Sequence, residues 1–374
     1  MSVRRIVIKL GTSTLTGGSP HMDQARMLEI VRVIARMRSR GVQTVLVSSG
    51  AVAAGREQLE YPELSGNVSS KQMLASAGQV RLIGMWADLF AIYKLQVGQM
   101  LLTRADLEDR ERYLNARDTL FALLEYGVVP IINENDAVSI AEIKVGDNDN
   151  LAALAAVLAE ADCLVLLTDQ KGLYTADPRL VPDASLIRRV DKIDEQVMAL
   201  AGGSGTRLGT GGMHTKLEAA QIATSAGIEV IVASGEEPLM IEFLIQGKGD
   251  ATFFTPAEHP VVARKTWISA ATRSRGVLVV DDGAKRALLL KGSSLLPRGI
   301  RAVEGNFPRG ATLEIQDLEG HSFARGLARY SSGELRLIAG LHSGEIEKVL
   351  GFTHGDVAVH RDDLVINVHS EEHP

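Results

Sequence analysis

The sequence has almost no cysteine, few aromatic residues and no excess of basic charge. Cys163 is the only cysteine among 374 residues, so no disulfide can form within the chain. It lies in the apolar run CLVLL, where we expect a buried strand position rather than a reactive thiol, and a reducing cytoplasm suits it best. Lysine and arginine number 40 against 46 aspartates and glutamates, a formal net charge of −6. The chain as a whole therefore lacks the positive charge that draws proteins to nucleic-acid backbones.

Long hydrophobic runs are also absent. No stretch reaches the roughly 18 apolar residues that a membrane span needs. The first ten residues, MSVRRIVIKL, hold too short an apolar stretch for a signal peptide, and we expect no membrane association. Hydrophobic residues nevertheless make up 45% and charged residues 23%, which allows a large buried core. At this length we expect a cytoplasmic globular protein of two domains.

The usual nucleotide and zinc motifs are missing too. The sequence has no GxxxxGK[ST], no GxGxxG after a predicted strand and no HExxH. Residues 360–367 match the HRDxxxxN spacing of a protein-kinase catalytic loop, but neither a DFG nor a glycine-rich loop accompanies them, so we reject the match. Any phosphate site must be built in another way.

Short apolar runs alternate with amphipathic helical patterns as far as about Phe254. Six runs read as buried strands: residues 3–10, 42–48, 95–102, 128–133, 163–169 and 228–234. Between the first two, apolar residues at helical spacing from Met27 to Met37 predict a helix that ends at Gly41. The alternation predicts an α/β fold with a mainly parallel open sheet sandwiched by helices.

The pattern changes after residue 275. Strand-like runs at 276–280, 312–317, 322–330 and 363–368 are separated by glycine-containing turns and two or three short helices, which predicts a small β-rich domain. We place the first domain at 1–258, a linker at 259–274 and the second domain at 275–367.

Polar and glycine residues follow several predicted strands of the first domain. Lys9 ends the first strand, in KLGTS, and Ser49 follows the second, just before a helix expected from about Ala51. Ligands bind at this edge of a parallel sheet, and a helix N-terminus attracts anions. Taken singly, each feature is equally well explained as an edge lysine or as an ordinary serine N-cap.

The least ordinary stretch is NENDAVSIAEIKVGDNDN, residues 133–150. Acidic or amide side chains occupy eight positions in two clusters: Asn133, Glu134, Asn135 and Asp136, then Asp147, Asn148, Asp149 and Asn150. Helix capping explains one of the second four, not all of them. We expect the two clusters to bind an ammonium group, a hydrated magnesium ion and lysine side chains.

Two further loops complete the pattern. Thr168 and Asp169 follow the strand at 163–169, and GSGTRLGTGGMHTK leads into a helix that carries Lys216 near its first turn. A glycine-rich approach to a helix N-terminus cradles phosphate through backbone N–H groups. Together Lys9, Lys216 and the acidic loop predict phosphoryl transfer, which depends on charge neutralisation and positioning and needs no nucleophilic side chain.

These motifs, in this order, resemble the amino acid kinase family. The resemblance is carried by KLGTS, VSSGAVAAGRE, GQMLLTRADLEDRERYLNARDTL, INENDAV, EIKVGDNDNL, LLTDQKGLYTADPR and GTGGMHTK, while GSSLLPRGI, GNFPRG and VAVHRDDL are similar to a PUA domain. It implies transfer of the γ-phosphoryl group of ATP to the side-chain carboxylate of L-glutamate, giving L-glutamyl 5-phosphate, the first step of proline biosynthesis. It also implies Mg²⁺, feedback inhibition by proline, a homo-oligomer (dimer or tetramer) and transient contact with glutamyl phosphate reductase.

The resemblance also assigns roles to residues. Lys9, Lys216 and Asp149 are implied to be catalytic, with Asp149 orienting the two lysines. Glutamate binding is implied for Ser49, Asp136, Asn148 and Asn133, with Asp136 the natural partner of the α-ammonium group. ATP binding is implied for Lys9, Thr168, Asp169, Thr210, Gly211, Gly212, Met213, His214, Thr215 and Lys216, with the backbone of His214 favoured over its ring.

Other functions stay open at this point, because the residues alone do not choose the acceptor. Within the family, the acceptor could be aspartate, acetylglutamate, carbamate or a nucleoside monophosphate, although the β-rich tail argues against these. From another class, an RNA-binding protein could act through the second domain, since residues 285–309 hold six basic side chains against Glu304 alone. Residues 275–374 as a whole hold 12 basic and 14 acidic side chains, which favours a structural or regulatory module.

Overall fold

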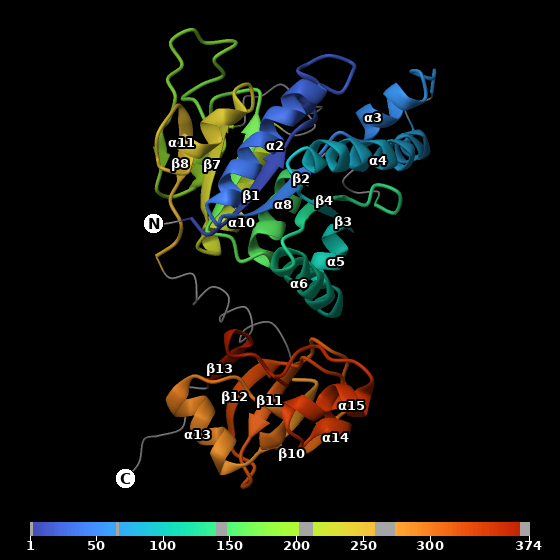
Figure 1. The fold of residues 1–374 in the computed structure, drawn as a ribbon. Helices are drawn as coiled ribbons and strands as arrows, with labels where there is room; N and C mark the ends of the chain where they lie inside the picture. Colours follow the sequence, from blue (N-terminus) through green and yellow to red (C-terminus); the bar gives the residue numbers. More distant parts are fainter. Residues whose placement is uncertain (1–2, 65–66, 140–147, 202–211, 259–273, 367–374) are drawn as a thin grey trace. The chain divides into compact units, whose positions relative to one another are not determined.

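The computed structural model describes residues 3–64, 67–139, 148–201, 212–258 and 274–366 (Figure 1). Contacts divide the chain into two units, residues 1–107 with 119–260 and residues 108–118 with 261–374. Each unit has its own sheet and its own hydrophobic core. The linker expected at 259–274 lies, apart from its last residue, outside the described residues.

An eight-stranded sheet organises the first unit, in the order β3-β4-β2-β1-β5-β7-β8-β6. Its strands are β1 (Arg5–Leu10), β2 (Gln43–Ser48), β3 (Val97–Leu102), β4 (Val129–Glu134), β5 (Cys163–Thr168), β6 (Arg189–Val190), β7 (Glu229–Ser234) and β8 (Ala251–Phe254). Every paired neighbour is parallel except β8, which runs antiparallel to β7. The mainly parallel sheet and all six predicted strands are confirmed, whereas β6 and β8 are too short to have left a recognisable run.

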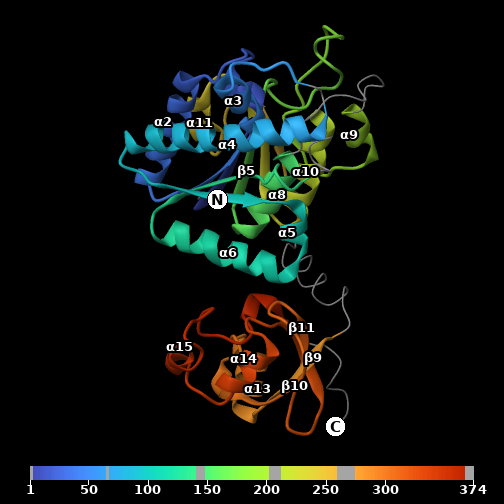
Figure 2. The same cartoon turned by 90° about the vertical axis from the view of Figure 1, so that its right-hand side faces the viewer.

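Helices cover both faces of this sheet (Figures 1 and 2). They are α1 (Thr12–Thr16), α2 (Gln24–Ser39), α3 (Ala51–Gln58), α4 (Val68–Ala91), α5 (Arg104–Glu108), α8 (Asn148–Leu158), α9 (Glu195–Leu200), α10 (Met213–Ser225) and α11 (Ile241–Leu244), with a 3-10 turn, η1, at Pro238–Met240. Helix α6 (Arg110–Glu125) is divided between the units, with residues 110–118 in the second and 119–125 in the first. Among the described residues, none of the helices has the length and apolar character that crossing a membrane requires.

Side chains along β1 alternate between the two faces of the sheet, and the two faces have different surroundings. Ile6, Ile8 and Leu10 pack with α2, α4 and α11 in one core. Because successive strand residues point to opposite faces, Lys9 is directed to the other face, where α8 packs on β1. The predicted helix between β1 and β2 is α2, which Asp23 caps by accepting a hydrogen bond from the Arg26 N–H, and Gly41 follows it with φ +84°.

Helices α3 and α4 pack unusually closely, because each presents a glycine to the other. A Cβ atom on Gly78 would lie 1.9 Å from the Ala51 carbonyl oxygen, and one on Gly55 would lie 1.9 Å from the Leu74 carbonyl oxygen. Neither position has room for a side chain. Since α3 begins directly after β2, this contact also fixes the position of α4 relative to the end of β2.

The second unit contains a five-stranded sheet in the order β10-β9-β11-β12-β13. The strands are β9 (Gly276–Val280), β10 (Ile300–Gly305), β11 (Thr312–Gln316), β12 (Ser322–Leu327) and β13 (Leu364–Ile366), with helices α13 (Asp282–Lys291), α14 (Ser332–Ile338) and α15 (Ile346–Leu350) and the 3-10 turns η2 (Pro297–Gly299), η3 (Ser343–Glu345) and η4 (Arg361–Asp363). The four predicted strands and the β-rich character are confirmed. The edge strand β10 was not predicted, because its charged and glycine residues mask the alternation.

Candidate active site

Two buried lysines meet one buried aspartate at the carboxyl edge of the first sheet. Lys9 lies one residue before the end of β1, while Asp149 and Lys216 lie in the first turns of α8 and α10. The Lys9 Nζ is 2.5 Å from the Asp149 Oδ1, and the Lys216 Nζ is 3.1 Å from the Asp149 Oδ2. The three residues are 5%, 0% and 4% exposed in chain order. One carboxylate thus holds two ammonium groups at the strand ends, where ligands of parallel sheets bind.

The charge state of Asp149 follows from these neighbours. Burial is the largest single influence and would raise the pKa of the Asp149 carboxyl, but the charges of Lys9 and Lys216 and the hydrogen bonds from Lys9 and Thr215 together outweigh it. The pKa therefore lies below its ordinary value. Asp149 is ionised at neutral pH and serves as a fixed counter-charge rather than as a proton acceptor.

A chain of polar side chains lies beside this cluster. The Asn148 Nδ2 donates to the Ser49 Oγ at 3.0 Å and to the Asn133 Oδ1 at 2.9 Å. Asn133, near the end of β4, is 2% exposed. Three of the four residues expected to bind the acceptor are therefore brought together. The fourth, Asp136, lies half-buried in the turn that follows β4.

The junction of β2 and α3 differs from an ordinary serine N-cap. The N-cap residue of α3 is Gly50, with φ +99° and no side-chain capping bond. Ser48 instead accepts a hydrogen bond at its Oγ from the Trp86 Nε1, 3.1 Å away. Ser49 is left facing Asn148, so its hydroxyl belongs to the polar chain and not to the helix.

Thr168 and Asp169 lie where β5 ends, as expected, and the Thr168 hydroxyl donates to the Asp169 Oδ1 at 2.9 Å. The loop that follows Asp169 is held by Thr252 of β8. The Thr252 Oγ1 accepts a hydrogen bond from the Leu173 N–H at 2.8 Å and donates one to the Ile187 carbonyl oxygen at 2.6 Å. A buried hydroxyl therefore fixes the loop that continues from Asp169.

The start of α10 is the glycine-led helix that the sequence predicts. Gly212 is its N-cap and no side chain caps it, while the Thr215 Oγ1 lies 2.8 Å from both the Gly212 carbonyl oxygen and the Asp149 Oδ2. The His214 ring is turned toward Glu218, with Nε2 3.4 Å from its Oε1. The predicted residues Thr210 and Gly211 lie outside the described residues, as do the loop residues 140–147 that include Asp147.

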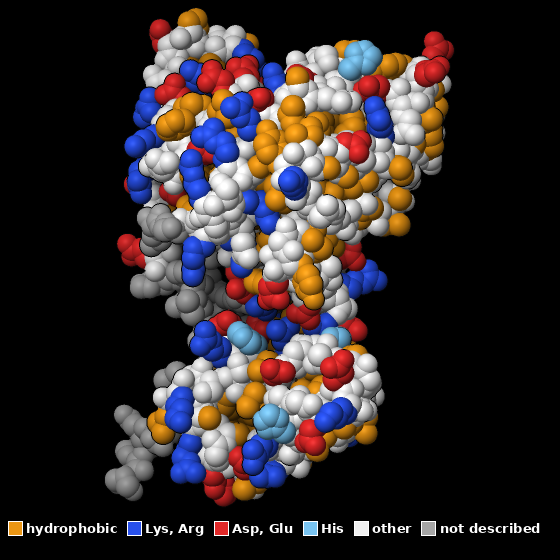
Figure 3. Space-filling model, viewed as in Figure 1, with side chains coloured by type: hydrophobic (Ala, Val, Ile, Leu, Met, Phe, Trp, Pro, Cys, Tyr) orange, Lys and Arg blue, Asp and Glu red, His pale blue; other side chains and the backbone are white. Residues whose placement is uncertain are grey.

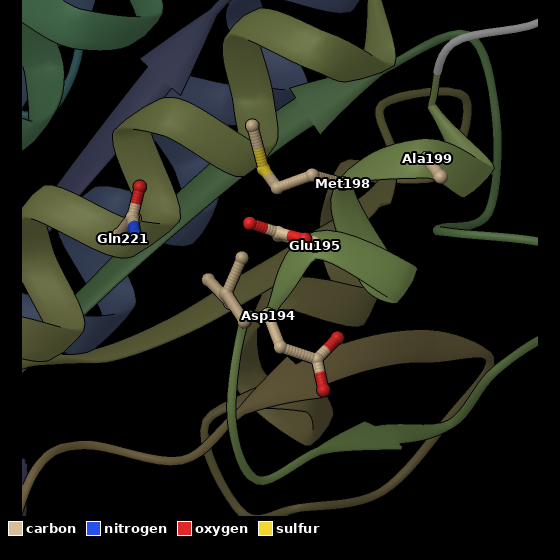
Figure 4. A pocket seen from close by; sticks show the side chains of 6 residues that line it. Asp194, Glu195, Met198, Ala199 and Gln221 are labelled. Atoms are coloured by element: carbon tan, nitrogen blue, oxygen red, sulfur yellow. The ribbon is translucent and has the colours of Figure 1, made fainter.

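An open pocket of about 570 Å³ lies between α9 and α10 (Figure 4). The Glu195 and Met198 side chains of α9 point into the space that separates them from Gln221 of α10. It is lined by Ile193, Asp194, Glu195, Met198, Ala199 and Gln221. Three of these residues are apolar and three are polar, two of the latter acidic.

The basic residues at 285–309 do not form one free positive surface in the second unit. The Lys285 Nζ lies 2.8 Å from the Asp317 Oδ2, and an Arg301 Nη lies 2.8 Å from the Asp281 Oδ2. Arg309 is 5% exposed. The phosphate-binding footprint considered from the sequence is thus reduced, because paired and buried cations attract nucleic acid weakly.

Comparisons with known proteins place the chain in a family. The amino acid kinase family model matches residues 4–234, and the PUA domain model matches residues 276–350. Proteins named "Glutamate 5-kinase" from Shewanella sediminis (strain HAW-EB3) and Serratia marcescens are 58% and 56% identical, each over 97% of this chain and 98% of its own length. Among solved structures, the product complex of T. acidophilum isopentenyl phosphate kinase aligns with 67% of this chain and 99% of its own, at a TM-score of 0.48 and 20% identity. The chain belongs to the amino acid kinase family and, within it, to the branch of the glutamate 5-kinases.

Proposed function

We propose that the protein transfers the γ-phosphoryl group of ATP to the side-chain carboxylate of L-glutamate, giving L-glutamyl 5-phosphate and ADP in the first step of proline biosynthesis. The observation that carries this proposal is the buried cluster of Lys9, Asp149 and Lys216 at the strand ends. Relatives that match nearly the full chain at 56–58% identity and are named for this activity support the choice of acceptor.

The chemistry needs little from a side chain except positive charge. The glutamate side chain, with an ordinary pKa of about 4.3, is ionised at neutral pH, so its oxygen attacks the γ-phosphorus without a general base. The bond from the γ-phosphorus to the bridging oxygen breaks, and ADP leaves with the electron pair. Lys9 and Lys216 neutralise the charge on the transferring group, and Asp149 holds both ammonium groups in place.

We assign the acceptor to the polar chain next to this cluster. Ser49, Asn133 and Asn148 supply neutral donors and acceptors for the glutamate, and Asp136 supplies the carboxylate that pairs with its α-ammonium group. The 2.9–3.0 Å hydrogen bonds of Asn148 support a pocket whose side chains are already positioned before the substrate binds.

We assign ATP to the other side of the cluster. The N-terminus of α10, a 13-residue helix, offers a positive end and free N–H groups to phosphate, from Gly212 through Thr215, with Thr210 and Gly211 before it. Thr168 and Asp169 would contact the ribose or base. The pocket beside α10 is the proposed position of the adenine ring.

Magnesium fits this arrangement as a companion of ATP. The described part of the sheet edge offers carboxylates at Asp136 and Asp169, while Asp149 is already engaged by two lysines. Mg²⁺ usually keeps phosphate oxygens and water as most of its ligands and takes only one or two carboxylates from a protein. When bound, it supplies charge neutralisation at the phosphates.

The experiment is a hydroxylamine trap for the acyl phosphate. Purified protein with ATP and Mg²⁺ is offered L-glutamate, L-aspartate, N-acetylglutamate, carbamate or UMP. We expect hydroxamate from L-glutamate alone, with Lys216→Met lowering kcat by about 10²–10³-fold. Lys248→Met, at an exposed position, is the matched control and should leave kcat unchanged. Formation of ADP with another acceptor, or with none, would refute the proposal.

We further propose feedback inhibition by proline at a site overlapping that of glutamate. The same charged groups that bind the α-ammonium and α-carboxylate of glutamate can bind those of proline. Proline is then expected to raise the KM for glutamate without lowering kcat. Inhibition that is noncompetitive with glutamate would exclude the overlap.

We also propose that the protein is a homo-oligomer, a dimer or tetramer. Hydrophobic side chains gather on the face of the first unit that carries α3 and α4 (Figure 3). Met73 and Val80 of α4 are 41% and 71% exposed, and Leu101 lies on β3, the edge strand of the sheet. Light scattering after size exclusion tests this, and a monomer at micromolar concentration would contradict it.

Two parts of the proposal concern the cell. L-glutamyl 5-phosphate is an acyl phosphate that hydrolyses readily, so transient contact with glutamyl phosphate reductase would limit its loss. The buried Cys163 has a raised pKa, from burial first and then from Glu229 and Asp162, and stays an unreactive thiol, in keeping with a cytoplasmic location.

A further inference from the structure

The polar chain beside the catalytic cluster does not end at Asn133. The Asn133 Nδ2 donates to the Oε1 of Gln79, 2.7 Å away on α4. Gln79 is half-buried, whereas Asn133 is 2% exposed. A donor as deeply buried as the Asn133 amide nitrogen is costly to leave without a hydrogen-bond partner, and Gln79 supplies that partner.

The direction of every hydrogen bond in the chain is fixed. The Glu134 backbone N–H can only donate, and it lies 2.9 Å from the Asn133 Oδ1. The other end of the Asn133 amide must therefore be the nitrogen, which needs an acceptor, and Gln79 supplies it. The Asn133 Oδ1 in turn accepts from the Asn148 Nδ2 at 2.9 Å.

This sequence of bonds decides how Asn148 faces the substrate. Its Nδ2 makes the bonds to Asn133 and Ser49. Since the nitrogen is committed to these bonds, Oδ1 is the atom of the Asn148 amide left to accept from a donor such as an ammonium group. The Asn148 Nδ2 also lies 3.4 Å from the Ser48 carbonyl oxygen. If the Asn133 amide turned over, Asn148 would meet a nitrogen and would lose the shortest of the three bonds that hold it.

Helix α4 is well suited to hold Gln79 still. Gly78, the preceding residue, lies against the Ala51 carbonyl oxygen so closely that no Cβ fits between them. Further along α4, the fully buried Trp86 donates to Ser48, next to Ser49. The helix thus makes hydrogen bonds to Asn133 of the acceptor site and to Ser48, the neighbour of Ser49.

We propose that Gln79 is a positioning residue for the amino-acid acceptor: together with the Glu134 backbone N–H it holds the Asn133 amide, which in turn holds Asn148 in the orientation that receives the substrate. The inference rests on the proposed function, because it assigns the acceptor to Ser49, Asn133 and Asn148. Gln79 itself need not touch the substrate. Replacing Gln79 should weaken binding of the amino-acid substrate and not of ATP, since no hydrogen bond of the polar chain from Gln79 to Ser49 involves Lys9, Lys216 or the start of α10.

The test compares Gln79→Met with Gln79→Glu in the full-length protein. Methionine keeps the length of the side chain and removes the acceptor, whereas glutamate keeps an acceptor oxygen in the same place. We expect Gln79→Met to raise the KM for L-glutamate about tenfold, with the KM for ATP within about twofold of wild type. Gln79→Glu should restore the KM for L-glutamate to within about threefold of wild type. Ser76→Ala, at an exposed position on the same helix, is the matched control and should change neither constant.

The outcomes are distinct. An unchanged KM for L-glutamate in Gln79→Met, equal changes in both KM values, or a Gln79→Glu variant as impaired as Gln79→Met would each overturn the positioning role. If Gln79→Met did not fold, the Gln79→Glu result would still decide. Glutamate at position 79 keeps the oxygen that accepts the hydrogen bond from Asn133, so a loss of L-glutamate binding in that variant would exclude the proposed role. A wild-type protein that does not phosphorylate L-glutamate would overturn the proposed function itself, and this inference with it.

Discussion

The proposed catalytic cluster depends on the negative charge of Asp149, which holds both lysines. Asp149→Asn keeps the volume of the side chain but leaves the ammonium groups of Lys9 and Lys216 without their shared counter-charge. We expect kcat to fall by about 10²–10³-fold, because both lysines lose the position from which they neutralise the phosphoryl group. The hydroxamate assay measures this. Asp88→Asn, at an exposed position on α4, should leave kcat unchanged, and an active Asp149→Asn protein would contradict the cluster's role.

The same residue makes a prediction about pH. The folded pKa of Asp149 is depressed, so its stabilising effect is fully present above the unfolded value of about 3.9 and is lost as pH falls through the folded pKa. At pH 7 the wild type should therefore melt at a higher temperature than Asp149→Asn, and the difference should shrink as the pH is lowered below about 4. Thermal scans from pH 7 to pH 3 test this, and a difference that persisted undiminished at pH 3 would be the contrary result.

At the residue scale, the sequence predicted where in the fold the site residues lie better than it predicted which side chains they contact. Lys9, Asp149 and Lys216 could be placed at one sheet edge, because the carboxyl ends of parallel strands meet there whatever the side chains do. That Asp149 orients both lysines was implied only by the resemblance. Gln79 escaped prediction altogether, since a single glutamine within a helix has no characteristic spacing and its partner Asn133 lies 54 positions away.

At the scale of elements, the contact between α3 and α4 makes the sharpest prediction. Gly78→Ala would place a Cβ atom 1.9 Å from the Ala51 carbonyl oxygen, so the helices must separate. We expect a loss of about 3 kcal/mol in the free energy of unfolding. The matched control is Gly84→Ala on the same helix, where nothing lies within 4 Å and alanine should add about 0.5–1 kcal/mol. Denaturant unfolding measures both, and equal effects of the two substitutions would refute the close-contact argument.

Elements were predictable where a long apolar run or a clear helical spacing marked them. The six strands of the first unit and α2 meet this condition. The short strands β6 and β8 do not, because they contain two and four residues and are defined by pairing with distant partners. The edge strand β10 pairs with β9 through residues that include Glu304 and Gly305, which no alternation rule would select.

At the scale of the whole molecule, the two hydrophobic cores predict two separable unfolding transitions. Among the described residues, the core around Ile6 and Trp86 shares no member with the core around Leu313 and Tyr330. A ligand that binds only one unit should then stabilise only that unit, by about 2.7 kcal/mol at a concentration of 100 times its Kd. Saturating L-glutamate with a non-hydrolysable ATP analogue is expected to raise one calorimetric transition and leave the other in place.

The second transition can be assigned through a group that belongs only to the second unit. Asp317 accepts hydrogen bonds from the Lys285 ammonium group and from the backbone N–H groups of Glu319 and His321. Although burial alone would raise its pKa, the hydrogen bonds from Lys285 and the His321 N–H, together with the charges of these two residues, lower the pKa to about 2. Asp317→Ala should lower the ligand-insensitive transition by about 2 kcal/mol at pH 7 and leave the ligand-sensitive one unmoved. Because the Asp317 pKa is depressed, this loss should shrink as pH falls from about 4 toward 2. One transition that responds to both the ligands and Asp317→Ala would show instead that the two units unfold together.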